Sequence, residues 1–332
     1  MRIYFGFALV LIMSVCMSAE AQLKFLADSS QQDKAALTFE RLTLIHSDDT
    51  ETQNGTALRN ELIAQASNQT VDVILLEPGT YDIGSTALNM VNGANIQGFA
   101  ANNTLITGSG SVVINGASSL EIHDISIHGS GNGSTIVLQD SGEMDLIEVN
   151  IQHNGTGTDA NFGIRVINGG SIYIQDSEIV FEQNGNSGSF TGLYIAGDDG
   201  AGQFSGGTMT NANLEILDDS NTMTLIGLQL GDGTTTPSGG EMVSIEIFGG
   251  IIVTGGGDSG TAIFVDSDAD LFIEGGCVES DDTALDNDGL GSAISTLFDG
   301  TRGGTGTTVY SQCSAYTVGG PAPINNSLTA VN

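Results

Sequence analysis

The sequence predicts an all-β fold: a solenoid formed by a parallel β-helix, with three short strands in each coil and a short helix at its N-terminal end. Two observations lead to this prediction. An apolar spacing recurs along the middle of the 332-residue chain at steps of 21 to 30 residues. The 47 glycines also disfavour long helices, because each glycine costs about 1 kcal/mol in a helix.

The repeated unit has the order apolar, any residue, apolar, two residues, apolar or small, any residue, apolar. It occurs as Leu120-Ile122-Ile125-Ile127, Met144-Leu146-Val149-Ile151, Ile172-Ile174-Ser177-Ile179, Gly202-Phe204-Gly207-Met209, Met223-Leu225-Leu228-Leu230, Ile245-Ile247-Gly250-Ile252 and Leu271-Ile273-Gly276-Val278. The period of two predicts a strand that buries alternate residues, and the extra central residue predicts a turn into a second strand. A third strand precedes several units: Ile136-Leu138, Ile164-Val166, Leu193-Ile195, Leu214-Ile216 and Ile263-Val265.

Three strands per step, with loops rich in Gly, Asn and Asp, describe one coil of a solenoid. Stacked coils pair their backbones at about 4.8 Å and form parallel sheets along the axis. The inward residues then form one continuous core. Its expected members are Ile122, Ile127, Leu146, Ile151, Ile174, Leu225, Ile247 and Ile273.

The open end of such a stack must be covered, because it exposes an unpaired strand edge. Residues 56–66 (TALRNELIAQA) place Leu58, Leu62 and Ala66 on one helical face and are expected to form this cap. The β-helix with its cap is therefore expected over residues 56–280. Residues 22–55 are a leader or a partial first coil, and residues 281–332 are a C-terminal coil or cap and a tail.

The first residues have the composition of a targeting segment. An apolar run over residues 3–16 follows Arg2 and precedes Ala19-Glu20-Ala21, which predicts a secretory signal over residues 1–21. We therefore expect a secreted protein, extracellular or at the cell surface, without a membrane span. Cys277 and Cys313 are left after cleavage, and for this pair a disulfide and two free thiols both stay open.

Charge excludes some partners. The chain has 40 acidic residues against 7 basic ones and a formal net charge of -33. Nucleic acids and anionic membranes need Lys and Arg to neutralise phosphates, so neither is an expected partner. The composition does not predict the oligomeric state.

Residues 71–81 (VDVILLEPGTY) combine an apolar strand with a Pro-Gly-Thr-Tyr turn. This segment resembles the first strand of secreted right-handed parallel β-helix proteins of the pectin-lyase-like superfamily. Residues 95–98 (NIQG) and 104–108 (TLITG) are similar to the next coil there, and residues 56–66 to its cap helix. The resemblance implies the right-handed fold over about residues 56–280. It does not imply one activity, since lyases, hydrolases, tailspikes and catalytically silent adhesins share the scaffold.

Neither enzymatic activity of this superfamily has a complete set of residues. A calcium-dependent lyase needs a basic catalytic residue, and Arg165 is the only basic side chain in residues 119–280 apart from histidines. A hydrolase needs paired carboxylates, which occur at 198–199, 218–219 and 281–282. The Asn-Thr-Asp, Gly-His-Gly and Arg-Ile-Lys motifs of polygalacturonases are absent, which favours solvated loop acids over a catalytic pair.

A polar column is expected four residues before each unit. Its members are Asp140, Asn168, Asp198, Asp219, Glu241 and Ser267, beside the outward strand residues Val137, Arg165, Tyr194, Glu215 and Phe264. Arg165 and Tyr194, with Asp140, Asn168 and Asp198, combine a cation, an aromatic ring and polar groups that suit a sugar. The alternative is that Arg165 only relieves repulsion among the acids and that Tyr194 is an ordinary surface residue.

A second column is expected four residues after each unit begins. It holds Asp124, Glu148 and Asp176, and then Gly206, Gly227, Gly249 and Gly275. The glycines predict a tight turn with positive φ. The three carboxylates at the same turn suggest Ca²⁺ as a cofactor, with solvated turn acids as the alternative.

The sequence therefore favours a secreted acidic β-helix protein that binds or coats polysaccharide or a cell-surface glycan without catalysis. A carbohydrate-active enzyme is the first alternative, a hydrolase with paired carboxylates more than a calcium-dependent lyase. A structural surface or adhesion protein is the second.

Overall fold

The computed structural model describes most of the chain between residues 42 and 297. The described residues are 42–47, 49–68, 72–90, 95–115, 119–154, 160–183, 188–197, 205–218, 223–231, 243–256, 259–265, 269–274, 277–280, 282–287, 293–297 and 324–325. The predicted signal segment, most of the predicted leader, Asp198 and Cys313 lie outside these residues, as does the side chain of Cys277.

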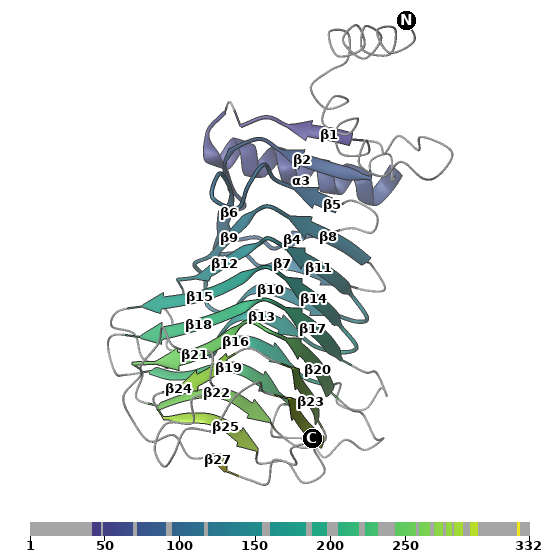
Figure 1. The fold of residues 1–332 in the computed structure, drawn as a ribbon. Helices are drawn as coiled ribbons and strands as arrows, with labels where there is room; N and C mark the ends of the chain where they lie inside the picture. Colours follow the sequence, from purple (N-terminus) through teal and green to yellow (C-terminus); the bar gives the residue numbers. More distant parts are fainter. Residues whose placement is uncertain are drawn as a thin grey trace, which may run out of the picture.

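The strands form three parallel sheets, which we call A, B and C (Figure 1). Sheet A contains β1 (Leu42–Ile45), β2 (Val73–Leu76), β5 (Asn95–Gln97), β8 (Ser119–His123), β11 (Glu143–Ile147), β14 (Ser171–Gln175), β17 (Gly206–Thr210), β20 (Val243–Phe248), β23 (Ala269–Glu274) and β26 (Ala293–Leu297). Sheet B contains β3 (Gly79–Asp82), β6 (Thr104–Gly108), β9 (Ser126–Gly129), β12 (Asn150–His153), β15 (Glu178–Gln183), β18 (Asn213–Asp218), β21 (Ile251–Gly255) and β24 (Cys277–Ser280). Sheet C contains β4 (Leu88–Asn89), β7 (Val112–Asn115), β10 (Ser134–Gln139), β13 (Ala160–Val166), β16 (Gly188–Ile195), β19 (Met223–Leu230), β22 (Ser259–Val265), β25 (Thr283–Asn287) and β27 (Ile324–Asn325).

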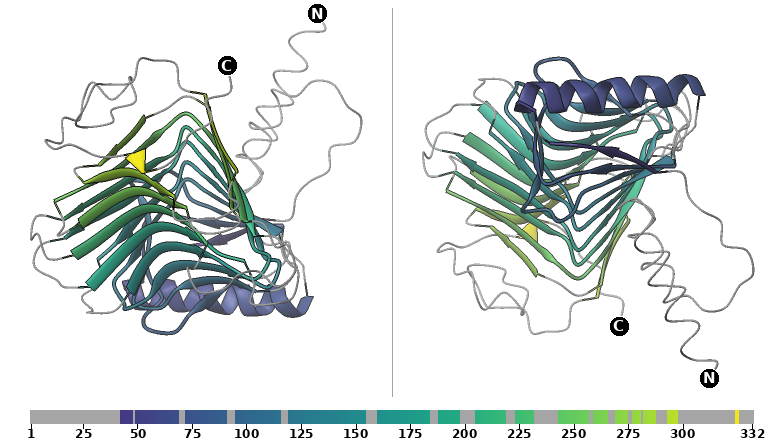
Figure 2. Two further views of the ribbon diagram at one scale, coloured as in Figure 1. Left: turned by 90° about the horizontal axis from the view of Figure 1, so that it is seen from below. Right: turned by 90° about the horizontal axis from the view of Figure 1, so that it is seen from above.

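From β2 to β26 the chain visits the sheets in the fixed order A, B, C, so each strand from β2 to β23 pairs with the strand three elements further along. At the two ends β1 pairs with β2, and β25 pairs with β27. The described strands complete eight such coils, from β2–β3–β4 to β23–β24–β25. Viewed along the axis, the strands of one sheet lie one behind another (Figure 2). The predicted single right-handed parallel β-helix is confirmed.

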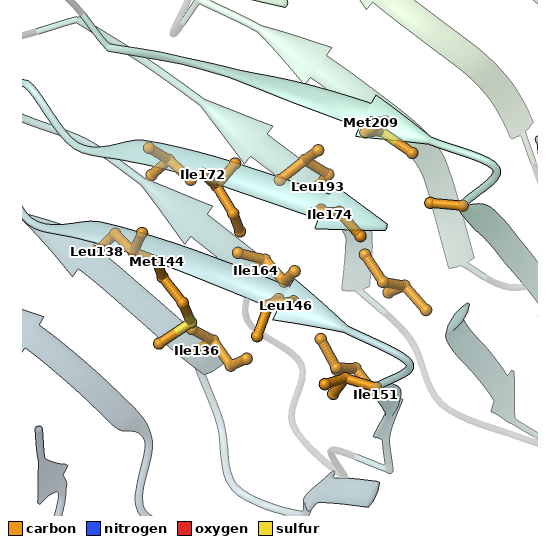
Figure 3. Close-up of a cluster of buried hydrophobic side chains, with 14 of the residues drawn as sticks. Ile136, Leu138, Met144, Leu146, Ile151, Ile164, Ile172, Ile174, Leu193 and Met209 are labelled. Atoms are coloured by element: carbon orange, nitrogen blue, oxygen red, sulfur yellow. The ribbon is translucent and has the colours of Figure 1, made fainter. Parts of the chain in front are cut away.

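Most of the core is one stack of inward side chains, as predicted, and a second, smaller cluster contains Phe181, Phe190, Ile216, Met223 and Leu225. All eight residues expected in the core are buried, none more than 3% exposed. Residues that occupy the same position in adjacent coils stack along the axis. Figure 3 shows two such pairs, Met144 with Ile172 and Leu146 with Ile174. Because every coil contributes to the same stack, the core is continuous along the helix axis.

The phase of the repeat differs from the prediction over residues 202–230. Gly207 pairs with Ile172, so it begins its unit rather than lying in the middle of one. Met223–Leu230 is not the start of a coil but strand β19 of sheet C. Strand β18, with Leu214 and Ile216, belongs to sheet B rather than sheet C.

A bend in sheet C explains this error. Gly163, Gly192, Gly227 and Ala262 lie at corresponding positions in four strands and are skipped in the residue pairing between them. The skipped residue adds one position between inward residues, so β19 acquires the same apolar spacing as a two-strand unit. A Cβ at Gly192 would lie 2.8 Å from the carbonyl oxygen of Gly227, which is too close for a side chain.

The helix α3 (Glu51–Asn68) is longer than the predicted segment 56–66. Thr50 and Gln53 explain its earlier start, because they form a capping box. The Thr50 amide donates to Gln53 Oε1 at 3.2 Å, and the Gln53 amide donates to Thr50 Oγ1 at 3.4 Å. None of the described helical residues forms a segment long and apolar enough to cross a membrane.

α3 packs on β3 and β4, the sheet B and sheet C strands of the first complete coil (Figure 2). Leu58 and Leu62 are buried in this contact. Arg59 fixes the helix to the turn between β3 and β4, with Nη1 donating to Ala87 O at 2.6 Å and Nη2 donating to Ile83 O at 2.8 Å and Thr86 O at 2.9 Å. The helix therefore replaces two strands of a coil and covers their open edge.

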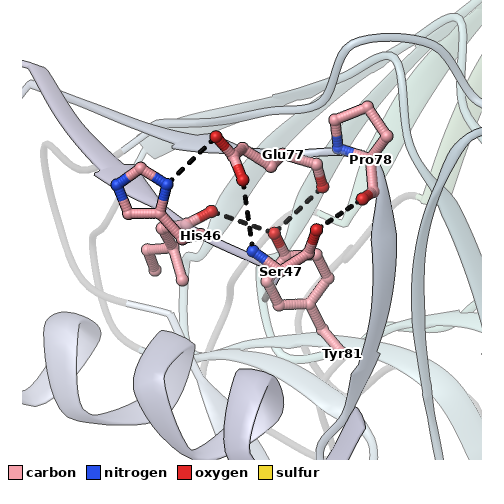
Figure 4. A network of polar contacts seen from close by, with 6 residues as sticks. His46, Ser47, Glu77, Pro78 and Tyr81 are labelled. Atoms are coloured by element: carbon pink, nitrogen blue, oxygen red, sulfur yellow. Dashed lines mark hydrogen bonds and ion pairs between the residues drawn. The ribbon is translucent and has the colours of Figure 1, made fainter. Parts of the chain in front are cut away.

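β1 is held on the first coil by a polar network (Figure 4). The hydroxyl of Tyr81 lies 3.0 Å from Ile45 O and 2.9 Å from Glu77 O. Ser47 Oγ donates to Pro78 O at 2.6 Å. Burial and the nearby charge of Glu77 raise the pKa of Tyr81 above its usual range, so its hydroxyl remains a hydrogen-bond donor.

The interior corner between sheets B and C contains a buried histidine. His153 is 1% exposed and lies against Phe181 and Phe190, with ring centroids 6.5 and 5.3 Å away. Its Nδ1 is 2.9 Å from Thr135 Oγ1, and a side-chain hydrogen bond with Asn161 opposes the effect of burial on the His153 pKa. Burial lowers the pKa of His153 to about 4, so the ring is neutral near pH 7.

Candidate functional site

A row of polar side chains runs along the outer face of sheet A. Glu121 of β8 pairs with Asp145 of β11, and Asp145 pairs with Tyr173 of β14. Asn95 of β5 continues the row at its N-terminal end, since Asn95 Oδ1 accepts a hydrogen bond of 3.0 Å from the Glu121 amide. We call Asn95, Glu121, Asp145 and Tyr173 the sheet A strip. The strands space its members about 4.8 Å apart.

Hydrogen bonds hold the side chains of the strip in place. Glu121 Oε2 lies 3.1 Å from His123 Nε2 and accepts a hydrogen bond from Asn95 Nδ2 at 3.5 Å. The Tyr173 hydroxyl donates to Gln175 Oε1 at 2.7 Å. All five of these side chains are partly exposed, so the strip presents ordered donors and acceptors to solvent.

Asp145 is the electrostatically perturbed member of the strip. Burial against its neighbours raises the pKa of Asp145, and the charges of Glu121 and Glu143 raise it further, while His123 acts in the opposite direction. The raised pKa widens the pH range in which Asp145 is protonated and can donate a hydrogen bond as well as accept one.

The predicted carboxylate column lies at the turn between sheets A and B, beside the strip. Asp124, Glu148 and Asp176 all have positive φ, at 56°, 55° and 48°. A hydrogen bond with Asp124 and repulsion between the two carboxylates raise the pKa of Glu148. The structure therefore brings Asp124 and Glu148 into direct interaction, with Asp176 on the next coil.

The glycine part of this column needs correction. The turn is continued by Asn211, with φ of 50°, and Gly249, with φ of 75°. Gly206 is instead the first residue of β17, and Gly227 lies in the bend of β19. Both errors follow from the shifted repeat phase over residues 202–230, and Gly275 lies outside the described residues.

The described residues contain no group of three or more His, Cys, Asp or Glu side chains that could hold a metal ion. Ca²⁺ prefers six to eight oxygen ligands, more than the contact between Asp124 and Glu148 supplies.

The predicted cluster around Arg165 lies on sheet C. Arg165 pairs with Tyr194, and its guanidinium carbon lies 5.8 Å from the Tyr194 ring centroid and 5.6 Å from that of Phe162. Tyr194 is only 9% exposed, so its ring face is not available as a platform for a sugar. The next residue in this row is Gln229, not Glu215, because β18 belongs to sheet B.

The polar column beside this cluster is present in part. Asp140 and Asn168 lie at the turn between sheets C and A, with φ of 54° and 53°, and Asn168 Nδ2 donates to Asp140 Oδ1 at 3.4 Å. Asp198 and the further predicted members Asp219, Glu241 and Ser267 lie outside the described residues. The structure thus joins two of the residues expected to flank Arg165.

The acid pairs considered for hydrolysis fall mainly outside the described residues. Asp218 ends β18 and is 1% exposed, which differs from the solvated loop expected for it. Asp282 is exposed. The described part of the chain does not bring them together as a pair.

Sequence reasoning missed the sheet A strip, although the repeat contains it. Glu121, Asp145 and Tyr173 each occupy the single position between the first two apolar residues of a unit. Period-two alternation turns that position outward, so three successive units predict a row of outward side chains. Phe162 gave no such signal, because the bend at Gly163 interrupts the alternation of β13.

Comparisons of the chain with models of known protein families, with curated proteins and with solved structures found no match.

Proposed function

We propose that this protein binds a polysaccharide along the sheet A strip without cleaving it. The observation that supports this is the in-register row of Glu121, Asp145 and Tyr173, extended by Asn95. Amide, carboxylate and phenol groups are the side chains that hydrogen-bond sugar hydroxyls, and a tyrosine ring adds an apolar face. An extended glycan lying along the axis would meet one polar group of the strip on each coil.

The charge of the strip favours a neutral glycan. Glu121, Asp145 and Glu143 lie close enough to raise the pKa of Asp145. The turn carboxylates Asp124 and Glu148 add to the negative potential of the same edge. A uronate polymer would be repelled by these groups and by the net charge of -33, whereas hydroxyl groups would not.

We also propose that the chain is a secreted member of the pectin-lyase-like superfamily. The segment that resembles this superfamily, residues 71–81, contains β2 and the first three residues of β3 in the first complete coil. The apolar segment over residues 3–16 supports secretion. Fractionation of the native host, with mass spectrometry of the mature N-terminus, tests this proposal.

A panel of neutral and acidic polysaccharides, assayed by affinity electrophoresis and calorimetry, tests glycan binding. Tyr173→Ala and Asp145→Asn should each weaken binding at least about tenfold, because they remove an apolar face and a charged acceptor. Arg165→Gln on sheet C serves as the matched control and should leave binding unchanged. Loss of binding in Arg165→Gln alone would transfer the site to the sheet C cluster.

A hydrolase is the second candidate, and one observation favours it. Asp145 has a raised pKa beside the in-register carboxylate of Glu121. At the strand spacing of about 4.8 Å the pair suits a retaining mechanism. A protonated Asp145 would give its proton to the glycosidic oxygen as the Glu121 carboxylate bonds to the anomeric carbon and the glycosidic bond breaks, and water activated by Asp145 would then hydrolyse the glycosyl ester. Release of reducing ends from a polysaccharide that binds, abolished by Asp145→Asn and by Glu121→Gln, would establish the enzyme and overturn the non-catalytic proposal.

We further propose that Ca²⁺ associates with the turn carboxylates from outside rather than in a closed cage. The support is the interaction between Asp124 and Glu148, where a divalent cation would relieve repulsion. Ca²⁺ would then act on stability and would take no part in a reaction.

A further inference from the structure

The outer face of sheet C differs in charge from the rest of the molecule. None of the six strands β7, β10, β13, β16, β19 and β22 contains an aspartate or a glutamate. The outer faces of the other two sheets carry acids, for example Glu121 and Asp145 on sheet A and Glu178 and Glu215 on sheet B. In a chain with 40 acidic residues, six successive strands of one sheet are free of them.

The same face carries apolar and aromatic side chains among uncharged polar ones such as Gln139, Gln229 and Thr261. Its outward, partly exposed residues include Val113, Val137, Phe162, Ile226 and Phe264. A surface that lacks charge and carries several partly exposed apolar side chains suits contact with another protein surface. We call the outer surface of these six strands the acid-free face.

We propose that the acid-free face is a self-association surface on which two copies of this chain pair about a two-fold axis. A partner approaching sheet A or sheet B meets carboxylates, and a second copy carries the same net charge of -33. Pairing of the two acid-free faces keeps the carboxylates of both copies at or beyond the rim. A two-fold axis produces this arrangement because it brings the same surface of each copy together.

The size of the face agrees with a weak but specific contact. Six strands at about 4.8 Å spacing span about 24 Å along the axis, and strands of six residues are about 20 Å long. The face therefore offers about 500 Å² per copy and about 1,000 Å² for the pair, near the lower limit for a specific interface. We expect a micromolar dimer rather than a nanomolar one.

Arg165 lies near the centre of the face, on the third of its six strands. Its guanidinium lies beside the rings of Phe162 and Tyr194, while the side chain as a whole is partly exposed. Arginine and aromatic residues are enriched at the centres of protein interfaces. Arg165 can donate to carbonyl or hydroxyl oxygens of the facing copy while the rings reduce the cost of burying its charge.

Salt dependence gives a test with a definite sign. Two copies with a charge of -33 repel each other at long range, and the Debye length falls from about 30 Å at 0.01 M salt to about 8 Å at 0.15 M. Dimerisation through apolar surfaces should therefore strengthen as salt rises. Dimerisation through ion pairs would weaken instead.

Gln229 and Gln152 provide a matched pair of isosteric substitutions. Gln229 is outward on the acid-free face between Tyr194 and Phe264, and Gln152 is outward on sheet B between His128 and Val180. Gln229→Glu and Gln152→Glu each add one negative charge at a half-buried surface position. In a two-fold dimer Gln229→Glu places one new carboxylate from each copy in the contact.

Sedimentation velocity of the full-length secreted protein, from about 1 to about 300 µM and at low and high salt, measures the equilibrium. We expect wild type and Gln152→Glu to dimerise alike, and Gln229→Glu to raise the dissociation constant by about tenfold or more. Equal melting temperatures would show that both variants are folded. A wild-type monomer over the whole range in high salt would overturn the proposal, as would equal effects of the two variants or association that weakens with salt.

Discussion

Replacing His153 with phenylalanine should remove a pH-dependent loss of stability. Burial lowers the pKa of His153 from about 6.5 in an unfolded chain to about 4 in the folded protein. Below pH 6.5 the unfolded chain binds a proton that folded His153 does not, so the folded state loses stability as the pH falls to about 4. Each pKa unit corresponds to about 1.4 kcal/mol, which gives a loss of about 3 kcal/mol over this range.

Phenylalanine suits the site, since His153 already lies against Phe181 and Phe190. The substitution leaves Thr135 Oγ1 without its 2.9 Å partner, at a cost of about 1–3 kcal/mol that does not vary with pH. His153→Phe should therefore be less stable than wild type, or equal to it, near pH 7. Between pH 7 and pH 4 the free energy of unfolding of the variant, relative to that of wild type, should rise by about 3 kcal/mol.

Urea unfolding of both proteins at several pH values between 7 and 4 measures the difference in their free energies of unfolding. The surface carboxylates titrate in both proteins, so their contribution largely cancels in this difference. His46→Gln is the control, because that side chain is 62% exposed. It should keep the pH dependence of wild type. Parallel pH profiles for wild type and His153→Phe, or a His153 NMR titration near pH 6.5, would refute the reasoning.

Three further predictions concern the first coil and the turn carboxylates. Arg59→Met should lower the free energy of unfolding in urea by about 3 kcal/mol, because three carbonyl oxygens lose a charged donor. Arg59→Lys should restore only part of this stability, because one ammonium group cannot reproduce the planar two-nitrogen geometry of the guanidinium. Full restoration by lysine would contradict this explanation. Tyr81→Phe should lower stability by about 1 kcal/mol and speed amide exchange in β1, and unchanged exchange there would show that the hydroxyl does not hold β1. Millimolar Ca²⁺ at constant ionic strength should raise the melting temperature, and the double variant Asp124→Asn, Glu148→Gln should show a smaller rise. Identical melting curves with Ca²⁺ and with EDTA would show that Ca²⁺ does not bind the turn carboxylates.

Much of the fold follows from local patterns that are consistent with one another. The spacing of Leu120, Ile122, Ile125 and Ile127 places two strands and the turn between them, and all four residues are buried. The carboxylate at the turn was also predictable, since Asp124 occupies the position where the backbone has φ of 56°. Such positions are specified by neighbouring residues in the sequence.

The remaining errors involve contacts between coils, which the spacing within one unit does not determine. Met223, Leu225, Leu228 and Leu230 match the repeat, yet their strand pairs with β16 and β22 in sheet C. The bend at Gly227 depends on the carbonyl of Ala262 in the next coil, so it cannot be recognised from β19 alone. The repeat correctly predicts the pairing of Arg165 with Tyr194, because β13 and β16 both lie where the apolar spacing places them.

The position of α3 has a consequence for the order in which the protein folds. A solenoid grows by adding coils to an existing edge, and the first coil is the hardest to form because it has no template. α3 and the coil under it lie near the N-terminus and leave the ribosome before the other coils. The capped coil can therefore act as the template on which each later coil adds in the order of synthesis. Removal of coils from the C-terminal end should then leave a foldable protein, whereas deletion of residues 51–68 should prevent folding from starting.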